Sequence, residues 1–297
     1  GYEVISMPPS SSGGIALISL LKAVEPYPLS RWGFQRDSTI QLIVEAERRI
    51  YADRSEHLGD ADFYQVPLRG LLEPSYLQNR MKDINFDKAT PSSDVKAGKP
   101  NVYESEQTTH FSIVDKEGNA VAITTTLNNS YGSQVVVKGA GFLLNDEMDD
   151  FSVKPGVPNL YGLLGGKANA IEPGKRMLSA MSPTIVTKNN DLFMVLGTPG
   201  GSTIITSVLQ TILNVVDFKM GIQQAVDAPR FHHQWMPDEI FVEEKAIDNT
   251  VRSNLESKGY KITPRSSIGR VDAILVNQDG SLIGGADVRG DDMAIGY

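Results

Sequence analysis

Residues 183–196 read PTIVTKNNDLFMVL, two short apolar runs separated by the polar turn 188–191. Short runs rich in Val, Ile, Thr and Phe that are joined by an Asn- and Asp-rich turn are typical of β-hairpins. Segments 110–124 and 271–284 have the same form. The three hairpins together predict six strands, which is enough for one substantial antiparallel sheet or for two.

Helices are predicted on both sides of the first two hairpins. Residues 204–216 are apolar on nearly every face, as in a helix packed between layers rather than at a surface. The apolar run 15–24 has helical length, and a capping pattern that begins at Ser38 predicts another helix over about 38–53. Residues 1–6 alternate like a strand. Helices that cover sheets indicate an α+β layered fold.

A linker is predicted before the first hairpin. Residues 67–100 are polar and carry four prolines, and 92–100 has the composition of an extended, exposed segment. If the chain divides anywhere, we expect it to divide there.

Composition excludes several classes of function. The chain has 297 residues, enough for a large core, and 28 basic against 36 acidic side chains give a net charge of −8. An acidic chain makes nucleic acid a poor candidate partner. Cysteine is absent, so the chemistry must come from Thr, Ser, His, Asp and Glu. We expect no membrane span, because no stretch approaches the roughly 20 apolar residues that one requires.

Thr108 and Thr109 stand where the linker ends and the first hairpin begins. Threonine is a common strand residue, so the pair by itself has an ordinary structural interpretation. The functional alternative is that the Thr108 hydroxyl attacks the Gln107 carbonyl to form an ester. Hydrolysis of that ester frees an α-amino group with a pKa of roughly 8, which can serve as the base for the same hydroxyl.

Three other motifs allow both structural and functional interpretations. Glycines in 197–202, between an apolar strand and a helix, form either a tight packing turn or a site where backbone N–H groups meet a ligand. The acidic run 147–150 is a solvated turn, a cation site or a site for an ammonium group. His232 and His233 lack a third ligand at zinc-like spacing, which favours a structural role.

Ordered motifs along the chain resemble the γ-glutamyltranspeptidase family. The runs Thr108–Asp115, Gly118–Val121 and Thr126–Asn128 resemble the start of that family's small subunit, whereas Ser10–Gly14 and Tyr51–Ser55 resemble the C-terminal part of its large subunit. Further matching motifs follow at Gly141–Asn145, Met148–Phe151, Lys154–Asn159, Met181–Thr184, Pro199–Ser202 and Ala228–His232. The resemblance covers essentially the whole chain.

The resemblance implies an N-terminal-nucleophile hydrolase fold, an αββα sandwich that matures by autoproteolysis at Gln107-Thr108. Residues 1–107 would be the C-terminal part of the large subunit, and 108–297 the small subunit. Thr108 would be the nucleophile and Thr126 the threonine that orients it. Gly200 and Gly201 would donate to the oxyanion.

The resemblance also implies a glutamyl pocket. Its α-amino ligands would be Asn128, Glu147 and Asp150, its carboxylate ligand Ser179, and its lid Tyr161. The family places a second serine after the first, where this chain has Ala180. The family's carboxylate-binding arginine lies upstream of the matched region. Arg54 and Arg230 stand in family-like motifs and are equally well explained as structural ion-pair partners.

The expected reaction is γ-glutamyl transfer from glutathione or a related amide to water, an amino acid or a peptide, in the periplasm or outside the cell. The resemblance implies no metal and no organic cofactor, and it implies the upstream part of the large subunit as a missing partner. Two alternatives stay open. One is a related acylase that acts on cephalosporins or polyglutamate, and the other is a fragment that keeps the fold and never cleaves itself.

Overall fold

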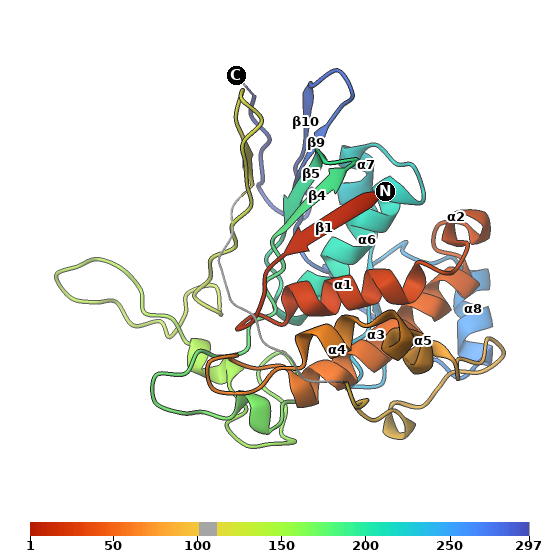
Figure 1. Cartoon of the computed structure of the whole chain (residues 1–297), viewed down its shortest axis with the longest axis horizontal. Helices are drawn as coiled ribbons and strands as arrows, with labels where there is room; N and C mark the ends of the chain where they lie inside the picture. The colour runs from red at the N-terminus through yellow and green to blue at the C-terminus, as the bar shows by residue number, and fades with distance from the viewer. Residues whose placement is uncertain (101–111, 297) are drawn as a thin grey trace.

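The computed structural model describes residues 1–100 and 112–296 of the chain (Figure 1). Its strands are β1 (Tyr2–Ser6), β2 (Ile113–Val114), β3 (Ala120–Val121), β4 (Thr184–Lys188), β5 (Asp191–Gly197), β6 (Phe231–His232), β7 (Ile240–Val242), β8 (Ile262–Pro264), β9 (Asp272–Val276) and β10 (Leu282–Gly285). Its α-helices are α1 (Gly13–Val24), α2 (Leu29–Trp32), α3 (Asp37–His57), α4 (Leu68–Leu72), α5 (Pro74–Met81), α6 (Ile204–Val216), α7 (Ile222–Asp227) and α8 (Asn249–Ser257). Short 3₁₀ turns are η1 (Ser92–Asp94), η2 (Glu147–Asp150), η3 (Lys167–Asn169) and η4 (Gly201–Thr203).

The main sheet has the strand order β1-β4-β5-β9-β10, and every neighbouring pair in it is antiparallel. The predicted hairpins at 183–196 and 271–284 are β4–β5 and β9–β10, and they lie side by side in this sheet. The hairpin predicted over 110–124 is shorter than expected, because its strands β2 and β3 pair over only two residues each. That small hairpin lies on the other side of the sheet from the helices, near β5 (Figure 1).

The core lies between the sheet and the helices. Val186, Met194 and Leu196 point to one face of the sheet and are fully buried. Helix α6 contacts β5, α1 and α7, and α1 also contacts β1 and α3 (Figure 1). The sequence prediction for 204–216 is therefore confirmed, since an apolar surface on nearly every face is what a helix between layers requires.

Strand β1 joins the N-terminal part of the chain to the C-terminal part. It pairs with β4 over five residues, from Tyr2 opposite Lys188 to Ser6 opposite Thr184. Residues on both sides of 101–111 thus share one sheet and one core. A cut between 107 and 108 would leave two chains held together by backbone hydrogen bonds and buried apolar contacts.

Two predictions of local structure were wrong. Helix α3 begins at Asp37 and is preceded by Arg36 in an extended conformation, so Ser38 lies inside the first turn and does not cap it. The stretch 67–100, which was predicted to be broken by its prolines, contains α4 and α5, because Pro67 and Pro74 stand at helix starts, where the missing N–H is not needed. Ser92 is fully buried rather than exposed.

Helix α3 buries most of its charged side chains. Glu45 accepts a hydrogen bond from Arg49 at 2.6 Å, and Asp53 pairs with Arg80 at 3.0 Å. Such pairs are required because an isolated buried charge is costly. Glu47 and Arg54 differ: within the described residues, neither has an oppositely charged group within 4.0 Å.

A membrane-spanning helix was not expected from the sequence. Within residues 1–100 and 112–296, none of the helices combines the length and the apolar character that a bilayer span requires.

We predict that Leu196→Ala lowers the free energy of unfolding by about 3 kcal/mol, because it leaves a cavity where the sheet meets the helices. Leu160→Ala is the matched control, since Leu160 is 57% exposed, and it should cost less than about 0.5 kcal/mol. Urea denaturation measures both. Equal losses in the two variants would contradict this placement of the core.

Candidate functional site

The predicted nucleophile, Thr108, lies in the segment 101–111 and therefore outside the described residues, as does Gln107. The other predicted site residues are described. They come from the long irregular stretch between β3 and β4 and from the turn that follows β5 (Figure 1).

The turn after β5 contains two glycines in conformations that other residues rarely adopt. Gly200 has φ 140° and Gly201 has φ 57°. A Cβ on Gly200 would lie 2.6 Å from the Thr203 hydroxyl oxygen, and one on Gly201 would lie 2.5 Å from a ring carbon of Tyr161. Backbone conformation and space both require glycine at these two positions.

The same turn presents two adjacent backbone donors. The Gly200 carbonyl group is held in place, because its oxygen accepts hydrogen bonds from the backbone N–H and the hydroxyl of Thr203, at 3.1 and 2.9 Å. Among the described residues, no acceptor lies within hydrogen-bond reach of the N–H of Gly200 or Gly201. Tyr51, from α3, also holds the turn, because its hydroxyl donates a hydrogen bond to the Ser202 carbonyl at 2.6 Å. Paired N–H groups at the start of a helix are suited to stabilise an oxyanion.

Tyr161 connects this turn to the segment that carries Asn128. Its hydroxyl donates to the Asn128 carbonyl at 2.9 Å, and its ring lies against Gly201. Its own carbonyl accepts from the Gln234 side chain at 3.0 Å. The predicted lid is thus held at both ends and in contact with the predicted oxyanion turn.

Thr126 and Asn128 form a local turn, in which the Asn128 N–H donates to the Thr126 hydroxyl oxygen at 2.8 Å. Thr126 is exposed, and as the acceptor in this bond it keeps its hydroxyl proton for another partner. Asn128 has φ 74°, a left-handed conformation that asparagine tolerates better than most residues.

Asp146 is a positioning residue that the sequence did not identify. It accepts from the Asn129 backbone and side chain at 3.0 and 2.6 Å, and its N–H donates to the Leu127 carbonyl at 3.1 Å. These bonds attach the Asn128 segment to the acidic turn. In the sequence, Asp146 is one more carboxylate beside an acidic run, so nothing there distinguishes its role.

The acidic run 147–150 forms η2, and its two predicted ligands have raised pKa values. Partial burial, with a smaller contribution from the charge of Asp146, raises the pKa of Glu147. Burial raises the pKa of Asp150 to about 6, and nearby Glu147 adds to that rise while Arg54 opposes it. Asp149 instead accepts from the Leu160 N–H at 2.8 Å. A cation placed here would relieve the repulsion among these carboxylates.

Ser179 is buried beside the segment that precedes α1. Its carbonyl accepts from the Ser12 N–H and hydroxyl at 2.9 and 2.6 Å, and its N–H donates to the Ser10 carbonyl at 3.2 Å. Its own hydroxyl oxygen accepts from the Met181 N–H at 3.0 Å, which leaves the hydroxyl proton for a ligand. Ala180, next to it, packs into the apolar core.

The two arginines of the family-like motifs have different surroundings. Arg230 forms a buried ion pair with Asp287 at 2.9 Å, which supports its interpretation as a structural partner. Arg54 donates from Nε to the Ser12 hydroxyl at 2.8 Å instead, and it lies close enough to Asp150 for the two charges to interact.

The adjacent histidines are part of the core. His232 contacts the Thr206 hydroxyl through Nδ1 and the Gln234 side-chain oxygen through Nε2, both at 2.8 Å. Because burial lowers the pKa of His232 to about 3, the ring is neutral, with its proton on Nε2 facing the Gln234 oxygen. In residues 1–100 and 112–296, no group of three or more acidic, His or Cys side chains is placed to hold a metal ion.

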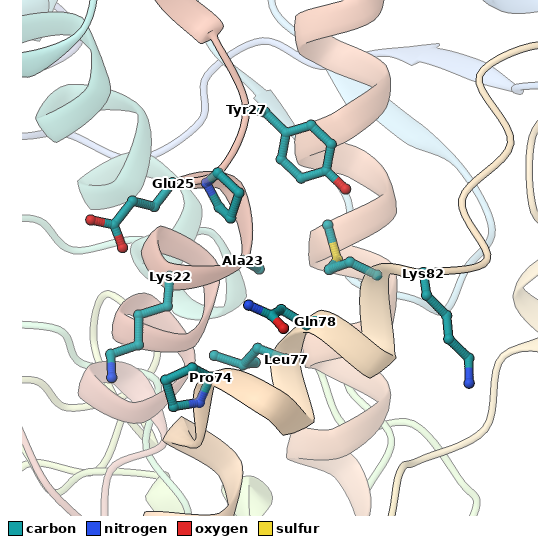
Figure 2. Close-up of a pocket in the computed structure, with 10 residues that line it drawn as sticks. Lys22, Ala23, Glu25, Tyr27, Pro74, Leu77, Gln78 and Lys82 are labelled. Carbon is teal, nitrogen blue, oxygen red and sulfur yellow. The ribbon is translucent and has the colours of Figure 1, made fainter.

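A cavity of about 400 Å³ lies elsewhere, between α1 and α5 (Figure 2). Its lining includes Lys22, Tyr27, Leu77 and Gln78 (Figure 2). It contains none of the predicted site residues, so it does not belong to the candidate site.

Comparison with known sequences gives matches along the whole chain. The family model described as Gamma-glutamyltranspeptidase matches residues 1–297. The glutathione hydrolase proenzyme of Escherichia coli (strain K12) is 49% identical over 100% of this chain and 51% of its own length. The acylase ACY 1 proenzyme of Pseudomonas sp. (strain SE83) is 34% identical over 98% of this chain and 49% of its own. The chain thus spans about half the length of these curated relatives.

Solved structures give the same picture. A cephalosporin acylase from Bacillus halodurans matches 100% of this chain and 52% of its own, with a TM-score of 0.84 and 25% identity. An acivicin-inhibited γ-glutamyltranspeptidase matches 62% of this chain and 100% of its own, with a TM-score of 0.60 and 56% identity. These likenesses confirm the predicted α+β fold of the N-terminal-nucleophile hydrolases.

We predict that Gly201→Ala displaces Tyr161 and loosens the segment between Lys154 and Lys167. Trypsin should cleave after the exposed Lys167, which is followed by Ala168, faster than in the wild type, as followed by mass spectrometry. Gly118→Ala is the matched control, because Gly118 also has a positive φ (84°) but a Cβ there meets nothing within 4 Å. Unchanged cleavage of Gly201→Ala would refute the contact between turn and lid.

Proposed function

Because the chain belongs to the γ-glutamyltranspeptidase family, we propose that the protein cleaves γ-glutamyl amides such as glutathione and transfers the glutamyl group to water, an amino acid or a peptide. The observation that supports this most directly is the contact chain from Asn128 through Tyr161 to Gly201. It unites a predicted ligand of the substrate, its lid and the predicted oxyanion donors in one place.

We propose that the chain first cleaves itself at Gln107-Thr108. The Thr108 hydroxyl attacks the Gln107 carbonyl, the C–N bond breaks to leave an ester and a free amine, and water then hydrolyses the ester. The pairing of β1 with β4 supports this step, because it would hold the two products in one sheet after the cut.

In the proposed reaction the freed amine of Thr108 accepts the proton of its own hydroxyl as that hydroxyl attacks the γ-carbonyl. The N–H groups of Gly200 and Gly201 stabilise the negative oxygen, and removing one such donor typically costs about 3 kcal/mol. The leaving amine departs with the proton, and the threonyl ester is then transferred to water or to an acceptor amine. The exposed Thr126 hydroxyl would orient the nucleophile.

The glutamyl end of the substrate would lie between the acidic turn and Ser179. Glu147 and Asp150, together with Asn128, would bind the α-ammonium group, and the Ser179 hydroxyl would bind the α-carboxylate. We propose that the carboxylate-binding arginine comes from a segment preceding residue 1, since the relatives are about twice as long. Export to the periplasm or beyond the cell is proposed from the family resemblance alone.

A second candidate is an acylase for a glutaryl-type group. Ala180 favours it, since a pocket with one hydroxyl fewer binds an α-carboxylate less strongly, and the likeness to acylases adds support. A chain that never cleaves itself is the third possibility, and the next experiment tests it.

We predict that the protein, expressed from its complete natural gene, yields a fragment that begins at Thr108. Intact mass and N-terminal sequencing identify this fragment. Thr108→Ala should remain uncut, whereas Thr109→Ala should still mature, because only Thr108 follows Gln107 directly in the chain. A wild-type chain that stays uncut after long incubation would favour the inert fragment.

We also predict that Glu147→Ala lowers kcat/KM for glutathione at least about tenfold while sparing a glutaryl amide that lacks the α-ammonium group. Steady-state hydrolysis of both substrates measures the difference. Glu117→Ala, an exposed carboxylate in the turn between β2 and β3, is the matched control. Equal losses for the two substrates would contradict the role given to Glu147.

A further inference from the structure

We propose that Arg54 is a positioning residue that joins the two sides of the glutamyl pocket, by holding the Ser179 segment through Ser12 and by interacting electrostatically with the Asp150 carboxylate. The inference rests on the proposed function and deepens it. It assigns a role to a conspicuous motif residue that neither the core nor the proposed chemistry uses.

The first part of the argument is a chain of hydrogen bonds. Arg54 Nε donates to the Ser12 hydroxyl oxygen at 2.8 Å, and that hydroxyl donates to the Ser179 carbonyl at 2.6 Å. Because the hydroxyl proton of Ser12 is committed to this carbonyl, its oxygen can only accept from Arg54. Arg54 therefore fixes the direction of the bond that holds Ser179.

The second part is the link between Ser179 and the acidic turn. The Asn169 side chain donates to the Asp150 carbonyl at 2.7 Å and accepts from the Leu178 N–H at 2.9 Å. Residues 178–179 are thus attached to Asp150 on one side and, through Ser12, to Arg54 on the other. The predicted ammonium and carboxylate ligands consequently share one rigid support.

The third part is electrostatic. Arg54 is 4% exposed, and among the described residues no carboxylate lies within 4.0 Å of it, whereas the buried arginines Arg49 and Arg230 each contact at least one. Burial lowers the pKa of Arg54, and the electrostatic interactions of Arg54 with Tyr51 and Asp150 oppose that effect. A buried cation placed this way favours the ionised form of Asp150, the form that an ammonium ligand needs.

The charges around Asp150 set the expected pH dependence. Its pKa of about 6 reflects burial, which raises it, followed by Arg54, which lowers it, and by Glu147, Asp149 and Asp146, which raise it. The Tyr161 phenol, whose pKa burial raises, faces it from the lid segment and is neutral in this range. Activity that needs ionised Asp150 should fall as the pH falls through about 6. Loss of the Arg54 charge should move that fall to higher pH.

Four variants separate charge, hydrogen bond and general damage. Arg54→Met removes both the charge and the bond to Ser12, whereas Arg54→Lys keeps only the charge. Ser12→Ala keeps the charge and removes both bonds of the Ser12 hydroxyl, the one from Arg54 and the one to the Ser179 carbonyl. Arg49→Met is the matched control, because Arg49 is a buried arginine on the same helix that bonds to Glu45 and Asp83 instead.

The experiment measures kcat and KM for glutathione hydrolysis between pH 4.5 and 9, with the protein expressed from its complete natural gene. In Arg54→Met the pH at which kcat/KM falls to half on the acidic side should move upward by on the order of one pH unit. In Arg54→Lys and Ser12→Ala, KM should rise while the pH midpoint of the acidic fall stays near 6. Arg49→Met should lower thermal stability without moving this midpoint. An unmoved midpoint in Arg54→Met, or an equal shift in Arg49→Met, would overturn the inference.

A second measurement needs no activity and therefore separates this inference from the proposed function. Amide hydrogen exchange of Ser12 and Ser179 in the substrate-free protein should become roughly tenfold faster in Arg54→Met and Ser12→Ala, and not in Arg49→Met. If the wild type had no γ-glutamyl activity, the proposed function would be refuted. The same exchange pattern would still support the positioning role of Arg54. Unchanged exchange in both variants would refute that role even in an active enzyme.

Discussion

The pairing of β1 with β4 is the constraint on which the rest of the molecule depends. It brings the first residues of the chain into a sheet whose other strands all come from beyond residue 183. Helix α1 is thereby placed against α6, with α3 packed against α1, and the core closes between segments that are far apart in sequence. The same pairing places Ser10–Ser12 beside Ser179. In an antiparallel pair the segment that follows β1, which holds Ser10–Ser12, meets the segment that precedes β4, which holds Ser179.

The candidate site is built on this frame by polar contacts rather than by apolar packing. Between β3 and β4 the chain contains no helix longer than the four residues of η2 in the part that the structure describes. Its geometry comes instead from side chains that bond to distant backbone groups, above all Asp146, Asn169 and Tyr161. Substrate recognition in such a site depends on a few hydrogen bonds, each of which fixes a long stretch of loop.

The sequence predicted the parts of the fold that depend on local pattern. The hairpins β4–β5 and β9–β10 and the buried helix α6 follow from apolar runs and turn residues, which need no knowledge of the rest of the chain. Helices α4 and α5 were missed because proline was interpreted as a helix breaker, whereas at a helix start it is well tolerated. The bonds of Arg54 and Asp146 could not be predicted, because their partners are set by the tertiary fold. The predicted nucleophile, Thr108, lies outside the described residues and stays a prediction.

The contact between Gly201 and the ring of Tyr161 also bears on how such a site can change during evolution. Any side chain at 201 would occupy space that the aromatic ring already fills. A lineage that enlarges residue 201 must therefore accept a smaller residue at 161 and, in addition, the strain of a left-handed backbone conformation at 201. The two positions should behave as one inherited unit, so divergence toward new acyl groups would begin at the aromatic side chain and not at the glycine.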